Sequence, residues 1–390
     1  MLVRKVEKLK DNKWTRLKAD VSWGNKGPFE VFFSVPAEYS EYVEDKSADP
    51  FVMSLIQIAA KYNENIEVEN ADVSEQLTCN IEDKLIPVLA KMKCGNGSTK
   101  IIASSNFRPI EDNRIAATGI SLGIDSFYSI VTNLPAKNKN LPISAVVYIH
   151  QVENWKQFDH MELKEKLRNQ EEVAQCYGLK LIPLVTNIRH IMESELVFSQ
   201  FHTFCHVGSV ATIKRLIKSY YYSTGYSYSE MKLSFSDSAN YENVIEDVFT
   251  FDDFSMISSG GNVTRFEKTQ ILSDDLVVQK YLDVCYHDKE NNTSFPNCTN
   301  CAKCVRTMTT LDVCGKLHFF GDVFDLDLYE KNKAKCWGDV FYRKIIAKDP
   351  FAVEICTHAQ NNKYNMPRTL WYYFLKKGIR NQIIKVKRKR

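Results

Sequence analysis

The fold follows from one stretch of the chain, Ala116-Ala117-Thr118-Gly119-Ile120-Ser121-Leu122-Gly123-Ile124-Asp125-Ser126. Its first half is a run of small, mostly apolar residues, and its second half is a turn rich in hydroxyl groups and glycine. An amphipathic segment, residues 127–131, follows directly, so we expect a strand, a tight turn and the start of a helix. The backbone N–H groups at a helix start lie at the positive end of the helix dipole, which makes this turn suited to an anion such as phosphate.

The side chains of the turn also suit a phosphate. Ser121 and Ser126 add hydroxyl donors, and Gly123 lets the backbone approach a ligand closely. Asp125 fits such a site if it caps the helix or helps to hold a divalent cation. The turn is not a Walker A loop, because the Gly-Lys-Ser/Thr ending of that motif is missing. An ordinary strand-to-helix turn without a ligand is the alternative interpretation.

The segment 121–126 resembles the Ser-Gly-Gly-x-Asp-Ser signature of the N-type ATP pyrophosphatases, the PP-loop superfamily. The resemblance implies an α/β fold of the adenine nucleotide alpha hydrolase-like, HUP-type class. It also implies an enzyme that binds ATP with Mg2+, transfers AMP to a substrate oxygen and releases pyrophosphate. The sequence departs from the signature at Leu122, where the signature has glycine, and a leucine has a steric cost at positive φ. The residues that would contact ATP are Ser121, Leu122, Gly123, Ile124, Asp125 and Ser126.

Length and composition are those of an ordinary globular protein. A chain of 390 residues should hold two domains, or one large domain with additions. Hydrophobic residues make up 44% and charged residues 25%, and no run is apolar and long enough to span a bilayer. The first residues lack a signal-peptide core. Eleven scattered cysteines favour reduced thiols over a disulfide scaffold, so we expect a cytoplasmic protein.

Residues 1–110 are expected to form a separate N-terminal α/β unit. The patterns predict strands at 29–35, 65–68 and 100–103, and helices at 51–62 and 73–93. This sequence segment shows no catalytic constellation, so a scaffold or a substrate lid is its default role. Cys79 and Cys94 are expected to be buried thiols.

Residues 111–318 are expected to form the ATP pyrophosphatase domain, built on a doubly wound, mostly parallel sheet. Predicted strands at 115–120, 143–149, 179–185 and 232–236 alternate with helices at 161–177 and from about residue 208 onward. Ligands of such sheets bind beyond the carboxyl ends of the strands. Ile149 and His150 end the second of these strands, where the resemblance places contacts to the nucleoside. A purely structural histidine is the alternative.

A helix with two cations is predicted after a glycine pair, with Thr264 as its cap. Arg265 and Lys268 fall one turn apart on one face of that helix. Cations there could neutralise ATP phosphates and stabilise the charge that develops during transfer, and the resemblance places a lysine in about this region. We therefore expect Asp125, Arg265 and Lys268 to be catalytic. A solvated helix face is the alternative.

Four cysteines further along are spaced like metal ligands. Cys285 is followed by Cys298, Cys301 and Cys304 at successive Cys-x-x-Cys spacing. This spacing predicts a closed, tetrahedral thiolate site for a structural Zn2+. An iron–sulfur cluster and four unrelated buried thiols are the alternatives, and Cys314 is a reserve ligand.

The two motifs together are similar to the 7-cyano-7-deazaguanine synthase family, whose members use ATP and ammonia and carry zinc on these cysteines. The spacer between Cys285 and Cys298 is longer than in that family, and the two terminal segments are foreign to it. We therefore expect a divergent bacterial relative with another substrate. The resemblance implies a ligase that activates a carboxylate or carbonyl acceptor with AMP and forms a C–N bond with ammonia or an amine. Two alternatives are sulfur transfer to RNA, with Cys205 or Cys314 as the sulfur carrier, and a zinc-stapled nucleotide-binding module without turnover.

Residues 319–390 are expected to form a helical extension with a basic tail. Aromatic and aliphatic residues suggest packed helices around 337–346 and 371–375. Residues 376–390 are strongly basic although the whole chain has a formal net charge of only +3. Such a tail suits an anionic membrane surface or nucleic acid, and a solubilising tail is the alternative. A homodimer is a further expectation.

Overall fold

The computed structural model describes residues 1–105, 113–286 and 294–387. The chain divides into two compact units. Unit 1 comprises residues 1–120 and 129–262, and unit 2 comprises residues 121–128 and 263–390. The division passes through the helix that follows the Ser121–Ser126 loop, so the loop belongs to unit 2 and the strand before it to unit 1. These boundaries differ from those expected from the sequence at residues 110 and 318.

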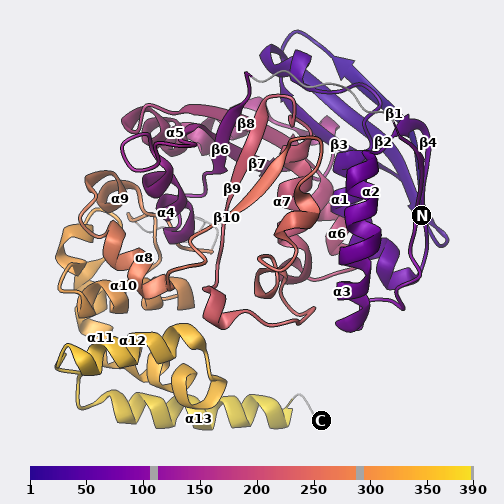
Figure 1. Ribbon diagram of the computed structural model, residues 1–390. Helices are drawn as coiled ribbons and strands as arrows, with labels where there is room; N and C mark the ends of the chain where they lie inside the picture. The colour runs from indigo at the N-terminus through magenta and orange to yellow at the C-terminus, as the bar shows by residue number, and fades with distance from the viewer. Residues whose placement is uncertain (106–112, 287–293, 388–390) are drawn as a thin grey trace. The chain divides into compact units, whose positions relative to one another are not determined.

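Unit 1 contains a single sheet of ten strands among the described residues (Figure 1). The strands are β1 (Leu2–Lys10), β2 (Trp14–Trp23), β3 (Lys26–Pro36), β4 (Ile66–Asp72), β5 (Ile101–Ser104), β6 (Ile115–Gly119), β7 (Ile143–Gln151), β8 (Lys180–Thr186), β9 (Ile217–Ser223) and β10 (Ser255–Ser259). Their spatial order is β10-β9-β6-β7-β8-β3-β2-β1-β4-β5. Pairing is parallel from β10 to β8 and from β1 to β5, and antiparallel from β8 to β1. The expected α/β class with a mostly parallel sheet is confirmed.

The helices of unit 1 cover both faces of this sheet. They are α1 (Asp49–Tyr62), α2 (Glu75–Asn80), α3 (Ile86–Lys91), α5 (His160–Cys176), α6 (Ile188–Glu193) and α7 (Phe198–Ala211). Successive residues of a strand point to opposite faces. On β3, Phe33 belongs to the large core with α1, α6 and α7, whereas Phe32 packs with Leu163 and Leu167 of α5. The helix α5 therefore covers one face, and α1, α6 and α7 cover the other.

The N-terminal strands β1 to β5 extend the sheet that the parallel strands β6 to β10 form. The join is antiparallel, with Phe33 of β3 opposite Thr186 of β8 and Ser34 opposite Val185. The strands and helices expected in residues 29–103 are confirmed, with small changes of their ends. Ser74 caps α2, where its hydroxyl accepts a hydrogen bond from the Leu77 N–H at 3.3 Å. The strands β1 and β2 were not expected.

Two expectations for unit 1 are wrong. The segment 232–236 is not a strand, because Lys232 N–H donates to Asn240 C=O within an irregular loop. The strand in this part of the chain is β9, which begins at Ile217, and the helix expected from residue 208 onward is α7, which ends at Ala211. Gly208 lies inside that helix, and a larger residue would not fit there because α1 approaches closely: a Cβ would lie 2.2 Å from Ser54 Oγ.

Unit 2 is helical apart from its loops. Its helices are α8 (Arg265–Leu272), α9 (Leu276–Tyr281), α10 (Ala302–Val313), α11 (Leu326–Tyr342), α12 (Pro350–Asn361) and α13 (Leu370–Lys387), and it shares α4 (Ile124–Asn133) with unit 1. The expected C-terminal helices are confirmed, but the expectation of which of their residues are packed is partly wrong. Ile345 and Ile346, expected to be packed, are 46% and 57% exposed.

Two further findings concern the exposure of two cysteines and the length and apolar character of the helices. Cys94 is buried as expected, whereas Cys79 is exposed, which corrects the expectation for that thiol. No helix among the described residues combines the length and the apolar character that crossing a lipid bilayer requires. The end of the expected basic tail, residues 388–390, lies outside the described residues.

Candidate functional site

The loop between β6 and α4 turns sharply at Leu122. The φ angle of Leu122 is 61°, which is the left-handed region that glycine favours. The leucine side chain is only 3% exposed, and its backbone C=O accepts a hydrogen bond from the Asp283 N–H at 2.9 Å. Burial of the side chain and this hydrogen bond offset the cost of the conformation. The glycine position of the signature therefore has its left-handed backbone here, although the residue is leucine.

Hydroxyl groups brace the same loop from within. The Ser121 N–H donates to Ser126 Oγ at 3.0 Å, and the Gly123 N–H donates weakly to Ser121 Oγ at 3.4 Å. A Cβ added to Gly123 would meet Ser121 Oγ at 3.5 Å and nothing else closer than 3.9 Å. A Cβ at Gly123 would thus make only ordinary van der Waals contacts, so the backbone there is not crowded, and N–H groups at the start of a helix point away from the helix toward a possible ligand. Such a backbone can receive an anion.

Two cations from α8 lie on the Asp125 carboxylate. Thr264 caps α8 as expected, in a capping box with Glu267. This cap starts the helix so that Arg265 and Lys268 are presented on one face. Arg265 forms an ion pair with Asp125 Oδ2, and Lys268 Nζ lies 3.4 Å from Asp125 Oδ1. The side chain of Lys268 is only 1% exposed, so this charge is held in a site with little water.

Two more cations come from α10. The guanidinium groups of Arg265 and Arg306 lie 5.1 Å and 4.3 Å from the centre of the Phe351 ring. Lys303 lies within electrostatic range of both, because burial and then the charges of Arg265 and Arg306 lower the pKa of Lys303. The Nε of Arg265 is buried and has no hydrogen-bond partner among the described residues. A concentration of positive charge thus surrounds the one acidic residue of the loop.

The four expected metal ligands lie together in unit 2. The sulfur atoms of Cys285, Cys298, Cys301 and Cys304 all lie within 4.8 Å of one another. The separations are 4.0 Å for Cys285–Cys301, 3.9 Å for Cys298–Cys304 and 3.4 Å for Cys301–Cys304. A tetrahedral zinc with Zn–S bonds of about 2.3 Å separates its sulfurs by about 3.8 Å. The cluster can therefore hold a metal ion such as zinc.

Backbone groups support this cluster in the way expected of thiolates. The Cys301 N–H points at Cys298 Sγ at 3.3 Å, and the Cys304 N–H points at Cys301 Sγ at 3.4 Å, at the start of α10. The hydrogen bond with the Cys304 thiol, and then the backbone N–H groups of Cys304 and Lys303, lower the pKa of Cys301, whereas the hydrogen bond with Cys301 and burial raise the pKa of Cys304. Several thiolates this close repel one another, so a bound cation would stabilise them.

Asn297 fixes the two halves of the cluster, and nothing in its sequence context indicates that role. Its Oδ1 accepts from the N–H groups of Val284 and Cys285 at 2.9 Å and 3.1 Å. Its Nδ2 donates to the carbonyls of Leu282 and Val323 at 2.8 Å and 3.1 Å. Asn297 thereby ties the segment that carries Cys285 to the segment that carries the other three ligands.

The alternatives for the cysteines can be judged by distance. In a [4Fe–4S] cluster each ligand sulfur binds a different iron, and in a [2Fe–2S] cluster the four sulfurs divide between two irons, so either cluster would hold some of the sulfurs farther apart than the 4.8 Å found here. The separations also exceed the S–S bond length of about 2.05 Å. The reserve ligand Cys314 is not among the four grouped residues, and burial raises its pKa to about 11. The geometry favours a single ion on the four expected cysteines.

Ile149 and His150 lie near the end of β7 in unit 1, as expected. His150 is 3% exposed, and its Nε2 has no hydrogen-bond partner among the described residues. Burial, followed by the charge of Lys166, lowers the pKa of His150, so the ring is neutral near pH 7. Contacts of these two residues with a nucleoside remain a prediction.

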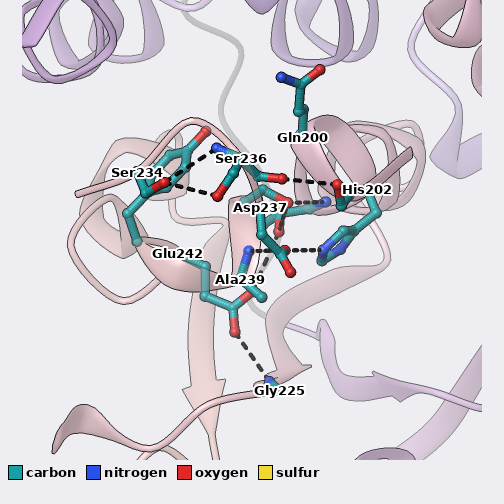
Figure 2. Close-up of polar contacts among 12 residues, drawn as sticks. Gln200, His202, Gly225, Ser234, Ser236, Asp237, Ala239 and Glu242 are labelled. Carbon is teal, nitrogen blue, oxygen red and sulfur yellow. Dashed lines mark hydrogen bonds and ion pairs between the residues drawn. The ribbon is translucent and has the colours of Figure 1, made fainter. Parts of the chain in front are cut away.

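A second polar cluster, missed in the sequence, lies where α7 begins in unit 1. Figure 2 shows His202 and Asp237 facing each other, with His202 Nε2 3.2 Å from Asp237 Oδ1. His202 Nδ1 lies 3.2 Å from the hydroxyl of Tyr222, which donates to Thr203. Asp237 directly follows the segment 232–236 that was wrongly predicted to be a strand, and the sequence pattern gave no sign of its contact with His202.

Comparison of the chain with family models, with curated proteins and with solved structures gives no significant match. The resemblance to the PP-loop superfamily therefore depends on the loop and on the cysteine spacing alone.

Proposed function

We propose that this protein is an ATP-dependent ligase of the PP-loop type. In this proposal it activates a carboxylate or carbonyl oxygen with AMP, releases pyrophosphate and forms a C–N bond. One observation carries the proposal: Asp125 of the signature loop forms ion pairs with Arg265 and Lys268. A loop that merely joins a strand to a helix has no need of two cations on its carboxylate.

The residues have distinct roles in this proposal. The backbone at Gly123 and the N–H groups at the start of α4 bind the phosphate end of ATP, with the N–H groups as donors. Arg265 and Lys268 neutralise the pyrophosphate as its charge develops. Asp125 holds both cations in place before the nucleotide arrives. Because its oxygens already contact two cations, Mg2+ enters the proposal as part of the substrate Mg-ATP, bound mainly through the phosphates.

The reaction follows from the charges that the loop can stabilise. The acceptor oxygen attacks the α-phosphorus, the bond to the β-phosphate oxygen breaks, and pyrophosphate leaves with the electron pair. A nitrogen nucleophile then attacks the activated carbon, and AMP leaves. Activation is necessary because a carboxylate is a poor acyl donor. Ammonia or an amine is supplied from solution or by a partner protein.

Zinc has a structural role in the proposal. All four tetrahedral positions are filled by Cys285, Cys298, Cys301 and Cys304, so the site leaves no open position for a substrate. The metal would instead fix the start of α10, the helix that carries Lys303 and Arg306.

Sulfur transfer to RNA has less support from the thiols. Cys205 is 5% exposed, and burial raises its pKa well above the usual value. The pKa of Cys314 is also raised by burial. Because the thiolate is the reactive form, neither residue is suited to carry a persulfide. A module that binds nucleotides without turnover is distinguished from the ligase by its products.

The products of ATP turnover test the proposal. The protein is incubated with Mg-ATP, ammonium and a set of carboxylate acceptors, and the phosphorus products are identified by ³¹P NMR. We expect AMP and pyrophosphate, with strong loss of both in an Asp125→Asn, Ser126→Ala double variant. Release of ADP and phosphate, or full activity of the double variant, would contradict the assignment.

A further inference from the structure

Helix α13 exposes a continuous apolar stripe. Trp371, Tyr372, Leu375 and Ile379 are 53%, 61%, 61% and 61% exposed. At about 100° per residue these four positions fall within an arc of about 100° on the helix. Single exposed apolar residues are common on protein surfaces, but four large ones on one face of one helix mark an interaction site.

The opposite face of α13 is fixed against α11. Gly338 of α11 allows a close crossing, because a Cβ there would lie 2.6 Å from Tyr373 Cβ and 3.0 Å from the Phe374 N. The Phe374 ring lies 6.2 Å from that of Tyr342, and Lys377 forms an ion pair with Asp339. The stripe is therefore not the side of α13 that packs against the rest of unit 2. It is the outward side of a helix whose inward side is already packed.

Cations border the stripe on α13 itself. Lys376 and Arg380 are both exposed, and at about 100° per residue they fall beside the apolar arc. They also line a groove of about 820 Å³ together with Lys335, Arg343 and Asp339, so they lie at the edge where the outward side of α13 meets its packed side. By sequence alone, five of the last six residues of the chain are Lys or Arg. The outward side of α13 thus joins apolar side chains to a positively charged border.

Three kinds of partner could cover such a face. A second copy of the chain would bring two positively charged borders together, which is unfavourable. RNA would be attracted by the cations, but Leu375 and Ile379 offer nothing to bases or phosphates. At a membrane surface, Trp and Tyr rings lie at the level of the headgroups, aliphatic side chains enter the acyl boundary and cations contact anionic lipids. Of the three, only a membrane surface matches the aromatic, the aliphatic and the cationic side chains of this face.

We propose that the outward face of α13 binds the surface of anionic membranes. The helix lies in the plane of the interface, with Trp371, Leu375 and Ile379 inserted and Lys376 and Arg380 at the headgroups. This attachment is peripheral, in agreement with the absence of a membrane-spanning helix among the described residues. The inference does not depend on the proposed ligase activity.

Co-sedimentation with lipid vesicles tests the inference. The full chain is mixed with vesicles of phosphatidylcholine alone or of an equal mixture of phosphatidylcholine and phosphatidylglycerol. We expect binding to the mixed vesicles only. The Leu375→Glu, Ile379→Glu double variant should bind about tenfold more weakly or worse, and Lys376→Glu, Arg380→Glu should lose a similar amount. All four side chains are exposed, so these changes should leave the fold intact.

Two controls match these variants. Leu276→Glu replaces an apolar side chain of α9 that is 78% exposed, and Lys137→Glu, Lys139→Glu reverses two exposed charges in another part of the chain. Both should bind vesicles like the wild type. Because the chain has 5 tryptophans, Trp371→Phe identifies the inserted one: the blue shift of fluorescence on vesicle binding should disappear in that variant.

Several results would overturn the inference. One is wild-type binding to mixed vesicles that the double variants keep in full, and another is no binding at all. Binding to poly-uridylate RNA without binding to vesicles would assign the face to nucleic acid. A dimer that dissociates in the Leu375→Glu, Ile379→Glu variant, without vesicle binding by the wild type, would assign it to self-association.

Discussion

At Leu122 the backbone has a conformation that its side chain disfavours. The φ of 61° costs a non-glycine residue about 1 kcal/mol. Burial of the side chain stabilises the fold by more than this cost, since removing a buried leucine side chain costs about 2–5 kcal/mol of stability. The leucine therefore keeps the loop in shape through packing, where glycine would do so through its freedom of φ.

This balance predicts an unusual order of stability. Leu122→Ala loses the packing and keeps the strained φ, whereas Leu122→Gly loses the packing and relieves the strain. We expect both variants to be less stable than the wild type, and the alanine variant to be the less stable of the two by about 1 kcal/mol. Urea unfolding of the three proteins measures this order. An alanine variant more stable than the glycine variant would show that φ of residue 122 is not left-handed.

His206 predicts a pH dependence of stability in unit 1. It lies half-buried in α7 and contacts the hydroxyl of Tyr220, and desolvation lowers its pKa from 6.5 to about 4. The unfolded chain therefore takes up the proton first as the pH falls. Stability is fully present above about pH 6.5 and decreases as the pH falls toward 4, by about 3 kcal/mol in total.

The unfolding free energy of wild type and His206→Gln, measured by urea titration over this pH range, checks the effect. Other titrating groups cancel in the difference between the two proteins. We expect the difference to shrink as the pH falls from neutral toward 4. Two parallel curves would contradict the desolvated, neutral state of His206.

At the scale of elements, the cysteine cluster and α10 form one structural device. Two of the ligands, Cys301 and Cys304, lie at the start of α10, and Asn297 joins their segment to Cys285. The helix then carries Arg306 to the Phe351 ring and Lys303 within electrostatic range of Arg265 and Asp125. The proposed metal would thus position charges as well as stabilise the chain.

This arrangement predicts one zinc per chain. Cys301→Ser should lower the zinc content from about one to well below one and destabilise unit 2. Cys314→Ser should keep its metal, which makes it the matched control. Because the ligands must be deprotonated, zinc should also be released as the pH falls. Elemental analysis measures the content, and a wild-type protein that is stable and free of metal would contradict the prediction.

The sequence was informative where a pattern is local. The loop 121–126, the cap at Thr264 and the spacing of Cys298, Cys301 and Cys304 each lie within a few residues, so their geometry could be inferred. Contacts between distant segments could not, as for Asp237 and His202, which lie 35 residues apart. The alternation of β2 could have been read from the sequence. In β1, a register shift between Arg4 and Glu7 interrupts that alternation.

On the scale of the whole molecule, the chain combines one extended sheet with a helical unit that carries the loop, the cations and the cysteines. The strand before the loop belongs to unit 1 and the residues that contact Asp125 belong to unit 2. The division expected from the sequence placed all of these in one domain, because it followed strand and helix order and not packing.

We propose that the loop and its cations bind the phosphates of ATP, and this binding can be tested without knowing the acceptor. Isothermal titration of Mg-ATP and of pyrophosphate is performed with the wild type, with Lys268→Met and with the control Lys316→Met, a surface lysine paired with Asp274. We expect the wild type and the control to bind both ligands, and Lys268→Met to bind them about tenfold more weakly or worse. A wild type that binds neither ligand, or a Lys268→Met variant that binds as well as the wild type, would contradict it.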